Sequence, residues 1–285
     1  MLVVLAVLVA SGLLLWVRSL WGGRIAAMQE MWGPALVLVA FVSLPLSEMG
    51  GLRPVLTFTL AMIWGLRLTV TSLRRLRVPA EAHDLVEARQ RWGTGFRRRS
   101  LVRVFGFQVV AVWVCTLALQ HGIIDAAPLP FGLIDLLGVL AWAVGMVVAM
   151  VADRQLARFR GTPDNVDQVL KTGLWRYSRH PNYFGEILIA VGLYLVASGG
   201  DTGLESLPAP IMFTALLVRV TGIPRSELGI DARRPGYAAY RQVTSAVLPL
   251  PPGQLLDDDV PIEYFGDWRP EHPPTGGTRG AGGSR

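Results

Sequence analysis

The 285-residue chain contains a single cysteine, Cys115, so it cannot form an intramolecular disulfide or a cysteine-based metal site. No metal site is predicted from the other residues either. Charged side chains are also few: Asp, Glu, Lys and Arg make up 17% of the chain, whereas a soluble domain carries about 25%. No internal repeat is visible. The scarcity of charge argues against an ordinary soluble domain and directs attention to the hydrophobic residues, which make up 52% of the chain.

These hydrophobic residues are concentrated in long runs. Seven runs contain no charged side chain: 1–17, 32–47, 54–66, 104–124, 136–152, 187–200 and 206–218. A helix that crosses the hydrocarbon core needs about 20 residues, and several runs reach that length only with a flanking Arg or Asp. The predicted transmembrane helices are therefore about 1–20, 32–50, 54–73, 102–121, 130–152, 183–200 and 206–223. We expect an all-α polytopic membrane protein with a seven-helix bundle. A soluble helical protein is disfavoured because its core would not need seven such runs.

Arginine is distributed unevenly between the predicted connections. Segment 74–99 alone holds eight arginines, and the segments after the first, fifth and seventh spans are also basic. The alternate segments 120–129 and 199–206 carry only Asp, Glu or His. Because Lys and Arg accumulate on the cytoplasmic side, we expect the N-terminus outside and the C-terminus in the cytoplasm. The first run could instead be a signal peptide, but no basic residue precedes it.

This topology accounts for the formal net charge of +6. A nucleic-acid partner is not needed, and part of the excess charge is expected to meet anionic lipid headgroups. The Arg- and Ala-rich composition suggests a bacterial inner membrane. Residues 251–285 are rich in Pro, Gly and Asp, so we expect a membrane domain over residues 1–250 followed by a disordered cytoplasmic tail.

Several ionisable residues lie within or beside the predicted spans. Such groups cost about 2.5–3.5 kcal/mol at the bilayer centre and usually face a polar cavity. Arg67 lies in the third span, where it either lines a site or extends to the membrane surface. On composition alone, Glu30 is an interfacial carboxylate, and Asp135 is expected at the interface. A helix over the end of the fifth span would place Asp153 and Arg160 on one face, directed into the cytoplasmic space.

Hydrogen-bonding side chains accumulate at the cytoplasmic ends of the spans. The set comprises Arg67, Arg74, Arg160, Lys171, Tyr177, Arg179, His180, Asn182, Glu186, Arg225, Tyr237 and Tyr240. Arginine binds phosphate through paired hydrogen bonds, and aromatic rings stack on bases, so the set suits a nucleotide-like anion. The alternative is topological, because basic residues are expected on this side in any case and Pro181 can simply begin a helix.

Asn182 and Glu186 stand four residues apart, so a helix places them on one face. Together they offer a donor, an acceptor and a carboxylate. This combination complements a primary carboxamide such as that of a nicotinamide.

The segment LKTGLWRYSRHPNYFGEILIAVGLYL, residues 170–195, resembles the C-terminal signature of the steroid 5-alpha reductase family, in its bacterial branch of seven-span proteins. The likeness extends through DRQLARFRG, WGLRL and the segment from VRVTGIP to VLPLPP, and weakly through QEMWGPAL. It covers about residues 28–252. Membrane sterol reductases and isoprenylcysteine carboxyl methyltransferases share the shorter pattern RHPxYxG, and the Asn and Glu of PNYFGE match the reductases.

The resemblance implies an NADPH-dependent reductase with its cofactor pocket on the cytoplasmic side. It implies that Asn182 and Glu186 hold the nicotinamide carboxamide. The rest of the dinucleotide would be lined by Arg67, Asp153, Arg160, Tyr177, Arg179, His180, Arg225, Tyr237 and Tyr240. The basic surroundings of the phosphates would favour NADPH over NADH.

The resemblance also implies a catalytic pair. Glu30 aligns with the glutamate that polarises the substrate ketone in steroid reductases. Trp64 stands where those enzymes have a tyrosine, and an indole can donate a hydrogen bond but cannot deliver a proton at ordinary pH. The expected reaction is hydride transfer to a C=C bond conjugated to a carbonyl, in a hydrophobic steroid- or lipid-like substrate that enters from the bilayer. Glu30, protonated through burial, would meet the charge on the carbonyl oxygen.

Three alternatives remain. A methyltransferase that uses S-adenosylmethionine would share the RHPxY segment and a basic cytoplasmic pocket. A non-catalytic membrane protein would bind neither cofactor, and Trp64 in place of tyrosine favours it. A transporter usually has broken helices or paired repeats, and the sequence indicates neither.

Overall fold

The structure is a computed structural model. It describes residues 1–20, 31–47, 51–76, 90, 92–124, 130–199 and 203–253, without the side chains of residues 74–76. These residues belong to one unit, Met1–Gly253. Glu30, the side chain of Arg74 and nearly all of the predicted tail 251–285 lie outside the described residues.

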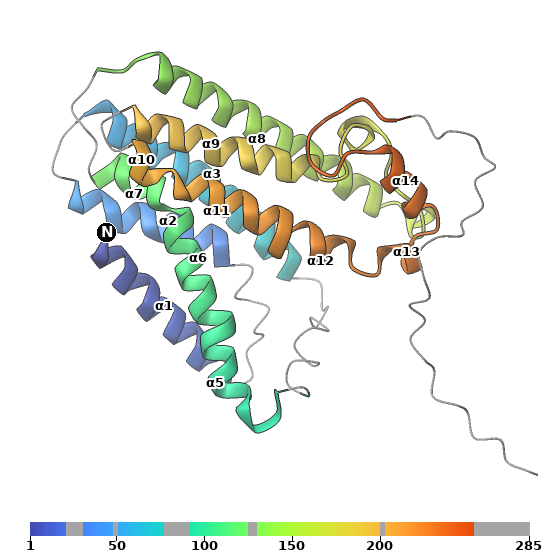
Figure 1. The fold of residues 1–285 in the computed structure, drawn as a ribbon, viewed down its shortest axis with the longest axis horizontal. Helices are drawn as coiled ribbons and strands as arrows, with labels where there is room; N and C mark the ends of the chain where they lie inside the picture. The colour runs from blue at the N-terminus through green and yellow to red at the C-terminus, as the bar shows by residue number, and fades with distance from the viewer. Residues whose placement is uncertain are drawn as a thin grey trace, which may run out of the picture. The chain divides into compact units, whose positions relative to one another are not determined.

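Every regular element in the described part of the chain is a helix (Figure 1). The longer helices are α1 (Leu2–Leu20), α2 (Trp32–Ser43), α3 (Leu52–Leu76), α6 (Phe107–Cys115), α7 (Leu117–Ile124), α8 (Leu133–Arg160), α9 (Pro181–Ser198) and α11 (Pro208–Ala215). Shorter helices are α5 (Phe96–Ser100), α10 (Gly203–Ser206), α12 (Ile223–Glu227), α13 (Ile230–Arg233) and α14 (Tyr237–Val243). Two segments are π-helical: η4 (Leu101–Gly106) directly precedes α6, and η7 (Leu216–Val220) directly follows α11.

Apolar helices long enough to cross a membrane make this an integral membrane protein. Five such helices lie within Leu2–Leu20, Leu52–Leu73, Leu133–Arg160, Pro181–Ser198 and Gly203–Arg233. A sixth span results if the bent pair Gly93–Cys115 and Leu117–Ile124 is counted as one. The second predicted span, 32–50, corresponds to an apolar helix over Trp32–Leu46 that is shorter than the rest. Five or six candidate spans are therefore present in the described residues, and the number seven stays a prediction.

The bent pair is a break that the sequence did not indicate. The helix axis turns by 47° between α6 and α7, where Thr116 has φ −100° and ψ 6°. Two side chains bind carbonyl groups beside the break: the Thr116 hydroxyl donates to the Val112 carbonyl at 2.8 Å, and the Gln120 amide donates to the Trp113 carbonyl at 3.2 Å. These local bonds explain how a break is tolerated inside a membrane, where backbone groups have no water to bind.

Helices α8 and α9 lie side by side along their length (Figure 1) and touch through glycines. A methyl group added at Gly145 would lie 2.6 Å from the carbonyl oxygen of Gly185, and one added at Gly192 would lie 2.6 Å from that of Gly138. Small residues let transmembrane helices approach closely and pack by van der Waals contact. This contact sets the spacing between the side chains at the end of α8 and those at the start of α9.

A buried ion pair joins α3 to α8 at the opposite end of the bundle. Arg53 donates to both carboxylate oxygens of Asp135, at 3.0 and 2.9 Å, and the two side chains are 4% and 2% exposed. Asp135 is thus buried inside the protein in the first turn of α8, and its expected depth at the membrane interface stays a prediction. A paired charge can be buried where an isolated one would be costly, and the partner comes from a helix about 80 residues away in the chain.

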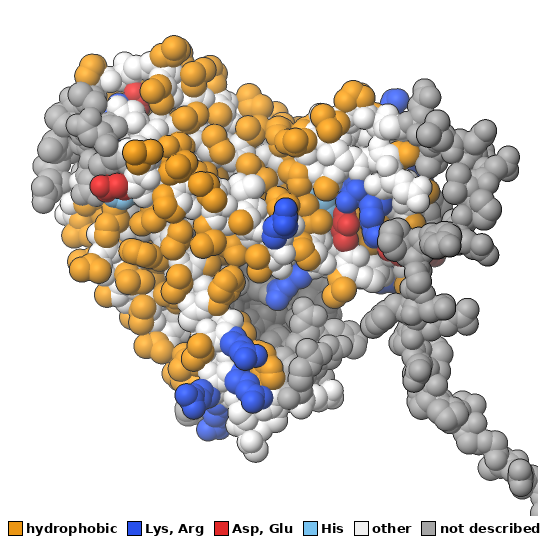
Figure 2. Space-filling view, viewed as in Figure 1, with side chains coloured by type: hydrophobic (Ala, Val, Ile, Leu, Met, Phe, Trp, Pro, Cys, Tyr) orange, Lys and Arg blue, Asp and Glu red, His pale blue; other side chains and the backbone are white. Residues whose placement is uncertain are grey.

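The outward faces of the helices are apolar. Leu14, Leu133 and Val144, for example, are 71%, 70% and 53% exposed. Figure 2 shows hydrophobic side chains across the face formed by the long helices, with Lys and Arg gathered at the α5 end and near α12 to α14. This distribution suits a protein whose sides contact lipid and whose basic ends contact water.

The α8–α9 contact yields a prediction. Gly185→Ala places a methyl group 2.6 Å from the Ala149 amide nitrogen and the Gly145 carbonyl oxygen, so the helices must separate, and overpacking of this kind costs about 1–3 kcal/mol. We expect a lower midpoint of thermal unfolding in detergent. In the control Gly106→Ala, on an exposed helix face, the nearest atom is 3.4 Å away, and the midpoint should not fall. Equal midpoints for the two variants would contradict the close packing.

Candidate functional site

Arg67 stands at the centre of a polar group formed by three helices. From α3 it donates to the Asp153 carboxylate of α8 at 2.7 Å and to the Glu186 carboxylate of α9 at 2.5 Å. The Arg67 side chain is 13% exposed and that of Glu186 is 10% exposed. The guanidinium therefore binds two acids with separate nitrogen atoms, a geometry that its planar shape permits. The prediction that Arg67 lines a site rather than extending to the surface agrees with this placement.

Trp64 lies one turn before Arg67 on the same face of α3. Its indole N–H donates to the second oxygen of Glu186 at 2.6 Å, and its side chain is buried. Both oxygens of Glu186 thus have a fixed donor. Trp64 has only one donor, so in this structure it positions Glu186, and a bond from Trp64 to a substrate would require the present one to break.

Asn182 lies in the first turn of α9, where its amide nitrogen donates to the Asp153 carboxylate at 3.3 Å. The amide oxygen is buried and has no hydrogen-bond partner among the described residues. A buried acceptor without a partner is costly, on the order of 1–3 kcal/mol. An unpaired acceptor is expected where a ligand supplies the missing donor.

These residues line a cavity of about 240 Å³, termed here the polar cavity. Its wall includes the polar group Arg67, Asp153, Asn182 and Glu186. The wall also includes Trp32, Thr71, Ser72, Gln108, Tyr183, Phe213, Leu216 and Leu217. Arg67 contributes one positive charge and the two carboxylates contribute two negative charges, so the formal net charge is −1. The cavity is suited to an uncharged or cationic group with amide-like hydrogen bonds.

Phe213 organises the aromatic side of the polar cavity. The rings of Trp32 and Trp64 both meet it edge to face, with centroid distances of 6.1 and 5.5 Å. Such pairs contribute about 0.5–1.5 kcal/mol beyond the area that they bury. The three rings from α2, α3 and α11 hold the inner end of the cavity in one shape.

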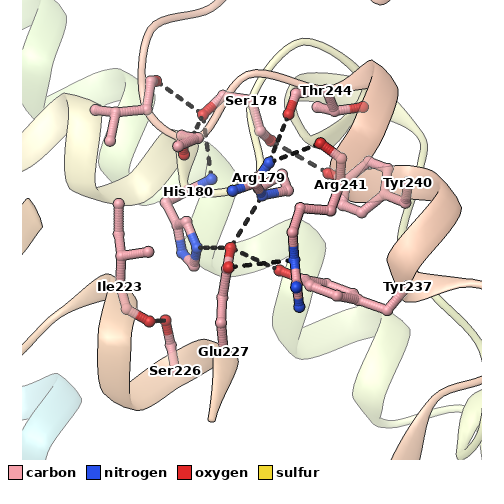
Figure 3. Close-up of polar contacts among 12 residues, drawn as sticks. Ser178, Arg179, His180, Ile223, Ser226, Glu227, Tyr237, Tyr240, Arg241 and Thr244 are labelled. Atoms are coloured by element: carbon pink, nitrogen blue, oxygen red, sulfur yellow. Dashed lines mark hydrogen bonds and ion pairs between the residues drawn. The ribbon is translucent and has the colours of Figure 1, made fainter. Parts of the chain in front are cut away.

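A second polar group, termed here the Glu227 cluster, consists of Arg179, His180, Glu227, Tyr237 and Arg241 (Figure 3). One oxygen of Glu227 accepts hydrogen bonds from Arg179 Nε at 2.9 Å, His180 Nε2 at 2.9 Å and the Tyr237 hydroxyl at 3.0 Å. The other oxygen lies 3.6 Å from Arg241 Nε. The cluster attaches α12 and α14 to the turn before α9.

The turn before α9 is held by further bonds from the C-terminal segment. Arg179 donates to the carbonyl oxygens of Arg241 and Thr244 at 3.0 and 2.8 Å. The hydroxyl of Tyr240 donates to the carbonyl oxygen of Trp175. Arg179 and Tyr240 therefore attach the C-terminal segment to the segment that precedes α9.

The Glu227 cluster changes the titration of its members. Burial lowers the pKa of His180, and the bond to Glu227 offsets only part of that effect. Burial and the Glu227 carboxylate raise the pKa of Tyr237, which keeps its hydroxyl a donor near neutral pH.

One stacked pair connects the Glu227 cluster to the polar cavity. The rings of His180 and Tyr183 lie parallel within 8° with centroids 5.1 Å apart, and Tyr183 lines the polar cavity. A change in the position of the C-terminal segment would therefore reach the cavity wall through these two rings.

The predicted cofactor residues thus fall into three groups. Arg67, Asp153, Asn182 and Glu186 line the polar cavity. Arg179, His180, Tyr237 and Tyr240 bind within the Glu227 cluster or its surroundings. Arg160, Tyr177 and Arg225 are exposed and do not belong to the described wall of the cavity. Of the predicted catalytic pair, Trp64 contacts Glu186, and Glu30 lies outside the described residues.

Residues of the polar cavity and the Glu227 cluster that were missed from the sequence include Trp32, Gln108, Tyr183, Phe213, Glu227 and Arg241. Glu227 is one of two acids, with Asp231, in a basic segment, which is a usable signal for an ion pair. Gln108 is a polar residue within an apolar run, which in a membrane indicates a buried polar contact. Trp32 and Tyr183 carry no such signal, because aromatic residues are common in spans and at their ends.

Comparison with known protein families identifies one match. A family model described as "Protein of unknown function (DUF1295)" matches residues 15–244, which include the described wall of the polar cavity and the whole Glu227 cluster. The chain therefore belongs to the DUF1295 family. No curated protein and no solved structure matches the chain.

The Glu227 cluster predicts a pH dependence. Because the pKa of His180 is lowered in the folded protein, the unfolded chain binds more protons as the pH falls below about 6.5, and stability is lost down to the folded pKa. We expect the thermal unfolding midpoint in detergent to fall between about pH 7.5 and about pH 5.5. His180→Gln, which keeps a donor but does not titrate, should flatten this change. If the unfolding midpoint changed with pH equally in the variant and in the unmodified protein, His180 would not be the cause of the pH dependence.

Proposed function

We propose that this member of the DUF1295 family is a membrane-bound reductase that uses NADPH to reduce a C=C bond, conjugated to a carbonyl, in a hydrophobic substrate from the bilayer. The observation that carries the proposal is the unpaired Asn182 oxygen in a cavity that Glu186 also lines. The likeness of residues 170–195 to the steroid 5-alpha reductase signature supports it, and we propose that the chain belongs to that wider group. The proposed site lies on the cytoplasmic side of a bacterial inner membrane.

The residues present fit the carboxamide of a nicotinamide. A primary carboxamide offers two N–H donors and one carbonyl acceptor. The free oxygen of Asn182 and the remaining lone pairs of Glu186 can accept those N–H groups. The second N–H of Asn182 can donate to the carbonyl, because its other N–H is directed to Asp153. The described wall therefore carries a partner for each of the three polar groups of the carboxamide, and the Asn182 amide must turn toward the ligand, because its oxygen is buried in this structure.

Size and charge limit which part of NADPH the polar cavity holds. A volume of about 240 Å³ lies below the roughly 300–1,000 Å³ of pockets that enclose drug-sized ligands, so the cavity suits the nicotinamide end alone. The formal net charge of −1 disfavours phosphate there. The phosphates would lie outside it, toward the basic segments that contain the exposed Arg160 and Arg225.

Bound NADPH would supply a hydride. The fixed negative charge of Asp153 and Glu186 stabilises positive charge that develops on a ring held beside them. Phe213 and Trp32 line the cavity with apolar rings, and we propose that these rings keep water away from the hydride and so protect it from side reactions. In this proposal the substrate gains a hydride at the β-carbon and a proton from water at the α-carbon, while Glu30 donates the hydrogen bond that stabilises the developing charge on the carbonyl oxygen.

A methyltransferase is the second candidate, and one observation favours it. The formal net charge of −1 attracts a cation, and the sulfonium group of S-adenosylmethionine is cationic. The RHPxYxG pattern is shared with isoprenylcysteine carboxyl methyltransferases. We favour the reductase because the paired Asn182 and Glu186 complement a carboxamide more fully than a sulfonium, which offers no hydrogen-bond donor. A non-catalytic protein is the third candidate.

Ligand titration tests the cofactor directly. The purified protein should bind NADPH, as measured by the fluorescence of the bound dinucleotide, and should not bind S-adenosylmethionine. We expect Asn182→Ala and Glu186→Gln to weaken NADPH binding about tenfold or more, which corresponds to about 1.4 kcal/mol for a lost hydrogen bond in a buried site.

The chain's other asparagine, Asn165, provides the matched control. It donates only to a backbone carbonyl, that of Phe159, so Asn165→Ala should leave NADPH affinity unchanged. Undiminished affinity in both cavity variants would remove the cofactor assignment. Binding of S-adenosylmethionine alone would favour the methyltransferase, and binding of neither ligand would favour the non-catalytic protein.

The bond from Trp64 to Glu186 yields a further prediction. Trp64→Phe keeps an aromatic ring against Phe213 but removes the donor to Glu186, so NADPH affinity should fall about three- to tenfold, the effect of one hydrogen bond. Trp142→Phe is the control, since its indole N–H is buried and has no partner among the described residues. An equal loss in both variants would show that ring packing, rather than the Glu186 bond, decides the affinity.

A further inference from the structure

A second cavity, termed here the apolar cavity, lies between α1, α2 and α6 and measures about 310 Å³. Its wall is almost wholly hydrocarbon, from residues such as Leu8, Leu15, Leu38 and Val112. The hydroxyl of Ser11, also in the wall, is occupied because it donates to the Val7 carbonyl at 2.8 Å. A space of this lining accepts an apolar chain and offers it no hydrogen bond along most of its length.

The apolar cavity reaches the lipid-facing side of the protein. Leu14 of α1 lines it and is 71% exposed, on a face where neighbouring side chains are also apolar. At the inner side of this cavity α1 and α6 are in close contact: a methyl group added at Gly12 would lie 2.6 Å from a methyl carbon of Val109. A chain entering from the bilayer therefore passes along α1 and α2 rather than between α1 and α6 at that point.

The two cavities share two residues. Trp32 and Gln108 line both the polar and the apolar cavity, and the Trp32 indole N–H donates to the Gln108 side-chain oxygen at 3.0 Å. Gln108 is 6% exposed. In the described walls, Trp32 and Gln108 are the only hydrogen-bonded side-chain pair that both cavities share. We therefore treat this pair as the boundary between the apolar cavity and the polar cavity.

The chemistry on each side of this partition specifies the ligand. The apolar cavity selects a hydrocarbon chain. The polar cavity, with its formal net charge of −1, disfavours an anionic head group. The Gln108 carboxamide carries N–H donors besides the oxygen that Trp32 uses, and such a donor suits a carbonyl oxygen. The matching ligand is an uncharged amphiphile with a carbonyl at one end of an apolar chain.

We propose that the apolar cavity holds the hydrocarbon part of such an amphiphile and that the Trp32–Gln108 pair is the gate through which its carbonyl end enters the polar cavity. The gate identifies Gln108 as a residue that determines specificity for the head group. The reduction of this ligand in the polar cavity rests on the proposed function. The route of the ligand through the apolar cavity rests on the two cavities alone.

Photocrosslinking tests the route without NADPH. The probe is a long-chain α,β-unsaturated ketone with a diazirine at the far end of its chain, added to the protein in phospholipid nanodiscs, and crosslinked peptides are identified by mass spectrometry. We expect crosslinks concentrated on residues 8–15 and 34–38. Ala35→Trp or Leu38→Trp, either of which fills the apolar cavity, should reduce these crosslinks about tenfold. Val144→Trp, on the lipid-facing side of α8, should leave them unchanged.

Head-group selection tests the gate. The same chain ending in a carboxylate should crosslink less than the ketone. Gln108→Leu should reduce the preference for the ketone, whereas Trp32→Phe, which keeps Gln108 but removes its partner, should preserve it. Crosslinks spread evenly over all lipid-facing helices, or unaffected by both cavity-filling variants, would overturn the proposal. A protein that fails to bind NADPH but gives the expected crosslinks would refute the proposed reaction and leave the route standing.

Discussion

The structure depends on one arrangement of charge, in which the Arg67 guanidinium of α3 is shared by the Asp153 carboxylate of α8 and the Glu186 carboxylate of α9. A charge near the bilayer centre costs about 2.5–3.5 kcal/mol when it has no partner, so these three helices are bound to one another once the charges are present. The glycine contacts between α8 and α9 permit the approach, because any larger side chain at Gly145 or Gly185 would separate the two backbones. Packing and electrostatics therefore require the same geometry, and the polar cavity results from it.

Two further groups of polar contacts join the helices around this arrangement. At the far end, the bidentate pair of Arg53 and Asp135 joins α3 to α8. Ion pairs thus tie both ends of these two helices, the Arg53–Asp135 pair fully buried and the Arg67–Asp153 pair partly exposed. Beside the start of α9, one carboxylate oxygen of Glu227 accepts hydrogen bonds from Arg179, His180 and Tyr237. The His180–Tyr183 stack makes the C-terminal segment a neighbour of the polar cavity rather than a separate appendage.

The proposed function requires the polar cavity and the apolar cavity to lie next to each other. Hydride transfer to a conjugated C=C bond needs a dry site, a fixed cofactor and a route for an apolar substrate. The aromatic rings around Phe213 are proposed to supply the first, the Asn182 and Glu186 side chains the second, and the α1–α2–α6 space the third. The Trp32–Gln108 bond lies where these functions meet, which makes it the point at which the identity of the substrate is expected to be decided.

Hydropathy along the sequence is sufficient to identify a helical membrane protein. Hydropathy and the i, i+4 spacing of Asn182 and Glu186 are local properties, and the expected grouping of Arg67 with Asp153 and Glu186 appears in the structure. The partners of Trp64, Asp135 and Arg179, the break at Thr116 and the shared position of Trp32 and Gln108 could be found from the three-dimensional structure alone. Each of these depends on which helix faces which, and that choice is made by glycine contacts and paired charges between segments far apart in the chain. Periodicity reports what one segment can bury but carries no information about the residue that it is buried against.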